Sequence, residues 1–75
     1  MINREEFLIG LKEQFESVDG DILDFDSKFK ELQTWDSLTR YSIIAFIKDE
    51  FNTDISSEKL NSVETPEDLF KLLVL

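Results

Sequence analysis

The chain has no cysteine and no histidine among its 75 residues. Without cysteine it forms no disulfide, and it has no thiolate to act as a nucleophile or metal ligand. Without histidine it lacks the commonest general base and the commonest transition-metal ligand. A serine hydroxyl is a poor nucleophile unless a base takes its proton. We therefore expect a protein that is not an enzyme, with no catalytic residues and no metal site.

Proline and glycine are also scarce, with one and two residues respectively, which leaves long stretches free to form helix. The longest purely apolar run is IIAFI at 43–47, far short of the ~18 residues of a transmembrane helix. We therefore expect no membrane span and a cytoplasmic location. A chain of this length predicts a single domain, 1–75, and we expect it to be a monomer.

Acidic residues outnumber basic ones by 17 to 8, which gives a net charge of −9. Such a surface repels nucleic-acid phosphates and anionic lipid, so nucleic acid is a poor partner. It favours partners that present Lys and Arg. The alternative is that the acidic residues only keep the protein soluble.

The first predicted helix covers residues 3–16. Asn3 is a good N-cap, and Glu6 lies three residues later in the capping-box position. One apolar face at helical spacing follows the cap, made of Phe7, Leu8, Leu11 and Phe15.

Residues 17–35 are predicted to form a long loop that is pinned to the core by scattered apolar side chains. Asp19-Gly20 is typical of a turn, and a short helical turn is expected at 21–25 or at 28–32. The acid-rich stretch 19–28 lacks the Gly and Glu spacing of an EF-hand, so it predicts a solvated acidic loop.

Three more helices complete the prediction. A central helix at 37–51, with Leu38, Tyr41 and Phe51 on its helical step, is expected to be buried over more than one face. A short helix at 56–60 is capped by Ser56 or Ser57, and the last begins with Thr65 as cap and Pro66 at its first position. The predicted fold is all-α, a four-helix bundle with a short third helix and a long loop between helices one and two.

Ser37 is the residue whose chemistry the sequence leaves open. At the start of the central helix it is well placed to cap it, because Ser is common at helix starts. Free backbone N–H groups and the helix dipole also favour a negative charge there, so a phosphodiester on its hydroxyl would be tolerated. Position and chemistry permit both roles.

WDSLTRYSIIAFIKDEFNTDIS (35–56) resembles the region around the attachment site of acyl carrier proteins. In that family the motif Asp-Ser-Leu, here Asp36-Ser37-Leu38, opens the second helix. Phe51 lies 13 residues and Ile55 17 residues after Leu38, as in the family's layout. The other matching positions are Ile43, Ile44, Ile47, Glu50, Val63 and Thr65.

The resemblance implies that a phosphopantetheinyl transferase moves 4'-phosphopantetheine from coenzyme A onto Ser37. The thiol of this arm would carry acyl groups as thioesters between acyl-loading and acyl-processing enzymes of a fatty-acid, polyketide or other specialised acyl pathway. It also implies an acyl pocket, with ordinary core packing as the alternative for each member: Ile43, Phe46, Ile47, Ile55, Leu60, Val63 and Phe70.

The resemblance further implies that basic patches of partner enzymes dock near the serine. The expected partner-binding residues are Trp35, Arg40, Asp49 and Glu50, although Trp35 has much apolar area and is expected to pack under the loop. Thr39, Ser42 and Lys48 stand where fatty-acid carriers commonly have acids, which favours a specialised pathway.

Two alternatives remain open at this point. One is a carrier of aminoacyl or peptidyl groups, with the same fold and the same serine. The other is an unmodified acidic helical interaction module in which Ser37 is only a cap, whose loss costs about 1 kcal/mol.

Overall fold

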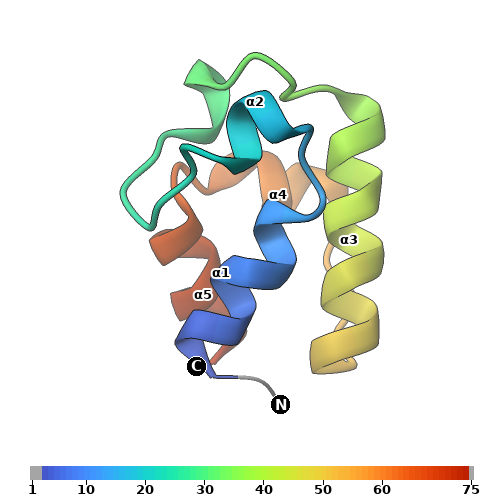
Figure 1. The fold of residues 1–75 in the computed structure, drawn as a ribbon. Helices are drawn as coiled ribbons and strands as arrows, with labels where there is room; N and C mark the ends of the chain where they lie inside the picture. Colours follow the sequence, from blue (N-terminus) through green and yellow to red (C-terminus); the bar gives the residue numbers. More distant parts are fainter. Residues whose placement is uncertain (1–2, 75) are drawn as a thin grey trace.

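The computed structural model describes residues 3–74, and this part of the chain is helical, with no strand. Its radius of gyration of 11.0 Å is that of a compact domain of this length. Figure 1 shows α1 between α5 and α3, with the segment that leads into α3 crossing the top of the molecule. The elements are α1 (Arg4–Lys12), α2 (Ser17–Gly20), the 3-10 turn η1 (Phe29–Glu31), α3 (Ser37–Phe51), α4 (Ser57–Ser62) and α5 (Pro66–Leu73).

The first helix begins as predicted but is shorter than predicted. Asn3 caps it, because its side chain accepts a hydrogen bond from the Glu6 N–H at 2.8 Å. The helix ends at Lys12 instead of residue 16. A Cβ on Gly20 would lie 3.0 Å from the Lys12 carbonyl oxygen, so α2 packs closely against the end of α1 and only glycine fits there easily.

The predicted long loop contains two short helical elements. The helical turn expected at 21–25 or at 28–32 is present in the second place as η1, and α2, which was not predicted, lies just before the first. The structure thus has five α-helices in residues 3–74, where the sequence predicted four. As expected, apolar side chains pin this segment to the core, because Leu23 and Phe29 are buried.

Asp19 is buried, which corrects the prediction that the whole acidic stretch is solvated. Its carboxylate accepts hydrogen bonds from the backbone N–H groups of Gln33 (3.1 Å) and Thr34 (2.6 Å), and from the Thr34 hydroxyl. Burial alone raises the pKa of Asp19, but the bonds from Thr34 and Gln33 outweigh it and lower the pKa below its ordinary value. The carboxylate therefore ties α2 to the segment before α3.

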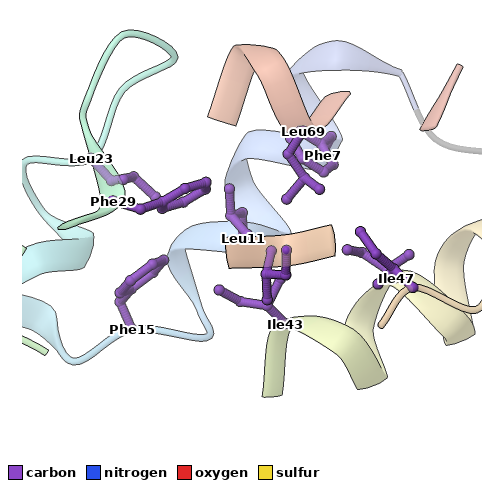
Figure 2. Close-up of a cluster of buried hydrophobic side chains, with 10 residues drawn as sticks. Phe7, Leu11, Phe15, Leu23, Phe29, Ile43, Ile47 and Leu69 are labelled. Carbon is purple, nitrogen blue, oxygen red and sulfur yellow. The ribbon is translucent and has the colours of Figure 1, made fainter. Parts of the chain in front are cut away.

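The core joins all the longer helices and the segment between α2 and α3 (Figure 2). Phe7 is fully buried, and its ring centroid lies 5.1 Å from that of Phe70, 5.8 Å from that of Phe51 and 6.1 Å from that of Phe46. Aromatic pairs at these spacings add to the stabilisation from apolar burial. The buried apolar residues are Phe7, Leu11, Phe15, Leu23, Phe29, Ile43, Ile47, Ile55, Leu60 and Leu69.

The central helix buries part of the predicted stripe, since Ile47 is buried and Phe51 packs on the core, but the stripe lies further from Leu38 and Tyr41 than predicted. Its buried residues are Thr39, Ile43 and Ile47, at four-residue spacing on one face. Leu38 and Tyr41, expected on the apolar face, are 77% and 65% exposed. Residues at i and i+3 share a helix face, so this pair forms an apolar outer surface beside Ser37.

The last two helices begin where their capping residues predicted. The Ser56 hydroxyl accepts from the Lys59 N–H at 3.1 Å, and the Thr65 hydroxyl accepts from the Asp68 N–H at 3.2 Å. Pro66 occupies the first turn of α5, where its missing N–H costs nothing. Capping chemistry acts locally, so these helix starts could be predicted.

Replacing Asp19 by Asn tests its role in the fold. At pH 7 we expect Asp19→Asn to lower the free energy of unfolding by about 1–3 kcal/mol. The Asn side chain has one acceptor oxygen instead of two, and its NH2 group is a donor that faces other donors. Urea denaturation measures the change, with the exposed Asp26→Asn as control.

The effect of Asp19→Asn should depend on pH. The folded-state pKa of Asp19 is lowered, so its stabilisation is present above the ordinary Asp pKa of about 3.9 and is lost as pH falls through the folded pKa. The difference between the parent and Asp19→Asn should therefore narrow below about pH 4. An equal difference at every pH would contradict this role.

Candidate functional site

The site is centred on Ser37, the first residue of α3, and the residue that caps this helix is Asp36. Asp36 has an extended backbone (φ −131°, ψ 179°), and its Oδ1 accepts a hydrogen bond from the Thr39 N–H at 2.9 Å. The hypothesis that Ser37 is itself the cap is therefore wrong. The capping group and the neighbouring hydroxyl are separate side chains.

The Ser37 hydroxyl is exposed and makes little contribution to the fold. Within residues 3–74 its one side-chain hydrogen bond is a long one, 3.5 Å from Nη2 of Arg40. Unpaired N–H groups in the first turn of a helix favour negative charge near such a position. A serine in this setting is accessible to a second protein and would tolerate an anionic substituent.

Two sets of contacts hold the chain just before the site. Asp19 binds the backbone of residues 33 and 34, as described above. Next along the chain, the Trp35 ring stacks on Phe29 at 4.7 Å (13° between planes) and on Phe15 at 6.3 Å (21°). Trp35 is thus half-buried under the loop, and Arg40 lies 5.7 Å from its ring centroid. The segment that leads into α3 is therefore held by hydrogen bonds to Asp19 and by the stacking of Trp35.

Asp36 keeps its negative charge at this end of α3. The hydrogen bond from the Thr39 N–H, followed by that from the Thr39 side chain and the charge of Arg40, lowers the pKa of Asp36 below its ordinary value. A charged N-cap also interacts favourably with the helix dipole. Ser37 thus follows a charged, hydrogen-bonded carboxylate in the sequence, and its hydroxyl is near the Arg40 guanidinium.

A small polar depression of about 120 Å³ adjoins the serine. It lies between the N-terminal part of α3 and α4, and its lining residues are Ser37, Arg40, Tyr41, Ser57 and Asn61. None of these side chains is a general base at neutral pH. The depression therefore has no side chain that would activate the hydroxyl.

The predicted partner-binding residues do not all gather at Ser37. Arg40 and Trp35 are next to it, as described above. Asp49 and Glu50 are exposed near the other end of α3, about 18 Å along the axis at 1.5 Å per residue. There they line a groove between α3 and α1.

The predicted acyl-pocket residues lie in one hydrophobic cluster. Ile43, Ile47 and Leu60 have no exposed surface, so an acyl chain would reach them only if α3 and α4 moved apart. The cluster also contains the buried Ile55 and the partly buried Phe46, Val63 and Phe70.

Several residues of the site could not be singled out from the sequence. Asp19 is one of four aspartates in DGDILDFD, and no local pattern distinguishes the buried one. Ser57 and Asn61 reach the depression because α4 packs beside α3, which is a tertiary contact. The position of Tyr41 could have been predicted, because it shares a helix face with Leu38 and not with Ile43.

No family model, curated protein or solved structure matches the chain. Among residues 3–74 no helix is long and apolar enough to cross a membrane. Within the same residues no three acidic side chains come together as a metal site.

Exchanging the two neighbouring residues for alanine separates their roles. Asp36→Ala should lower the melting temperature at pH 7 by several degrees, because the Thr39 N–H loses its acceptor. Ser37→Ala should stay within about 2 °C of the parent. The lowered pKa means that the contribution of Asp36 is present above the ordinary Asp pKa and lost as pH falls through the folded value. Thermal unfolding followed by circular dichroism measures both variants, and a larger loss for Ser37→Ala would overturn the assignment of the cap.

Proposed function

We propose that the protein is an acyl carrier whose 4'-phosphopantetheine arm is attached to Ser37. The observation that carries this proposal is that the cap of α3 and the free hydroxyl beside it belong to two different residues. Asp36 does the capping, which leaves the Ser37 hydroxyl exposed and available. The Asp-Ser-Leu motif and the spacing to Phe51 and Ile55 add the resemblance to acyl carriers.

Attachment requires a transferase, because the chain has no His or Cys. The Ser37 oxygen attacks the phosphorus of coenzyme A that bears pantetheine, a new O–P bond forms, and the pyrophosphate P–O bond breaks. Adenosine bisphosphate leaves, and a base of the transferase takes the hydroxyl proton. The positive end of α3 and the nearby Arg40 favour the negative phosphodiester that results.

The fold supports the proposal in outline. In this view α1, α3, α4 and α5 are the four helices of a carrier bundle, and α2 and η1 belong to its long first connection. The acyl chain would enter the cluster around Ile43, Ile47 and Leu60 when α3 and α4 separate. The arm would supply the thiol that the chain lacks, and every chemical step would occur in a partner enzyme.

The acidic surface supports partners with basic docking patches, as for a monomeric cytoplasmic carrier. The cargo belongs to a fatty-acid, polyketide or other specialised acyl pathway. Arg40, Ser42 and Lys48 make α3 less acidic than the whole chain, which favours a specialised pathway. An aminoacyl or peptidyl cargo would use the same serine.

A second candidate function is an unmodified acidic interaction module. The exposed apolar pair Leu38 and Tyr41 favours it, because a docking surface next to Ser37 needs no covalent arm. The two candidates differ in whether Ser37 becomes modified.

Intact mass spectrometry distinguishes them after incubation with coenzyme A and a broad-specificity phosphopantetheinyl transferase. We expect one phosphopantetheine-sized gain on the parent and none on Ser37→Ala. Ser57→Ala is the matched control, because its hydroxyl lines the same depression, and it should be modified like the parent. No gain with several active transferases would reject the carrier and leave the interaction module.

A further inference from the structure

A groove of about 560 Å³ runs between α1 and α3 on the outside of the molecule. The two helices run in opposite directions (Figure 1), so residue 6 of α1 lies toward residue 50 of α3 and residue 14 toward residue 42. The α3 wall runs from residue 42 to residue 50, a length of about 12 Å at 1.5 Å per residue. The groove is therefore as long as two turns of a third helix laid between the first two.

The apolar part of the groove is made of Ile9, Gly10, Ala45 and Phe46, and α1 approaches Phe46 closely at the glycine. The Phe46 ring occupies the space that a Cβ on Gly10 would need, so the aromatic ring lies flush against the α1 backbone. Ile9 stands at the edge with 58% of its surface exposed, and Ala45 adds a small side chain opposite. An exposed isoleucine next to an aromatic ring is a site for an apolar anchor residue.

The walls of the groove are acidic. Glu6 and Glu13 come from α1, Asp49 and Glu50 come from α3, and no Lys or Arg lines the groove. Within residues 3–74 the ion pairs are Arg4–Glu67 and Lys48–Asp54, so none of these four carboxylates is paired. Four unpaired negative charges around the apolar part of the groove are complementary to cations that flank an apolar stripe.

We propose that this groove binds a basic amphipathic helix of a partner protein. An apolar side chain of that helix covers Ile9 and Phe46, and its Lys or Arg residues pair with Glu6, Glu13, Asp49 and Glu50. A second copy of this chain is a poor occupant, because its net charge is also −9.

The groove is separate from the attachment site. Its nearest α3 residue, Ser42, lies five residues beyond Ser37, and the acidic pair 49–50 lies about 18 Å along the helix. A partner in the groove leaves the Ser37 hydroxyl uncovered, and it binds whether or not Ser37 is modified. The groove shares Asp49 and Glu50 with the partner-binding residues that the resemblance implied, but binding in it does not require that Ser37 carries an arm.

A synthetic helical peptide tests the proposal. The probe has Leu on one face and Lys and Arg on its flanks, and its charge-reversed twin has Glu at each basic position. We expect the basic probe to bind with saturable amide shifts in an NMR titration, concentrated at residues 6–14 and 42–50. The acidic twin should not bind, and added salt should weaken the basic probe.

Two pairs of variants make the test specific to the groove. Ile9→Ser should weaken binding about tenfold, whereas Ile22→Ser, which changes another exposed isoleucine outside the groove, should not. Glu13→Lys should also weaken binding about tenfold, whereas Glu58→Lys, with the same change of net charge on α4, should not. All four positions are exposed, so the variants should remain folded.

The outcomes are distinct from those of the modification assay. Binding by Ser37→Ala that equals the parent supports the proposal, even if no arm can be attached. Equal weakening by Glu13→Lys and Glu58→Lys would show non-specific charge attraction and overturn it. Absence of saturable shifts, shifts centred outside the groove, or self-association through the groove would also overturn it.

Discussion

The start of α3 depends on one buried carboxylate, that of Asp19. The backbone N–H groups of residues 33 and 34 lie outside any helix, and the carboxylate accepts hydrogen bonds from both. Hydrogen bonds to a charged acceptor are stronger than neutral ones, and burial removes the competition from water. Because Trp35 and Asp36 follow directly, this interaction holds the segment that leads into α3.

Packing and capping at the start of α3 are done by the residues before Ser37, so its hydroxyl takes part in neither. Trp35 stacks on Phe29 and Phe15, so it holds the segment to the core. Asp36 caps the helix. Since the neighbours supply both packing and capping, the serine hydroxyl contributes little to stability and remains accessible to a partner. A carrier needs such an arrangement, because covalent attachment must not disturb the fold.

The sequence predicted the parts of the fold that depend on local chemistry. Thr65 and Pro66 start α5 as expected, because a cap and an N-terminal proline act within one turn. The end of α1 at Lys12 was not predicted, and the close approach of Gly20 in α2 to the Lys12 carbonyl there is a tertiary contact that no local pattern shows. The depression beside Ser37 likewise needs α4 in place. The motif singled out Ser37 as the candidate residue, and the fold was needed to show that Asp36 is the cap.

The most direct test of the carrier function uses protein isolated from its native source. Digestion and fragmentation mass spectrometry would show whether the peptide that contains Ser37 bears phosphopantetheine. If the protein is a carrier, we expect a modified Ser37, with the arm released on fragmentation and an acyl group on its thiol in part of the sample. A peptide that carries an unmodified Ser37 in every sample would contradict the carrier function.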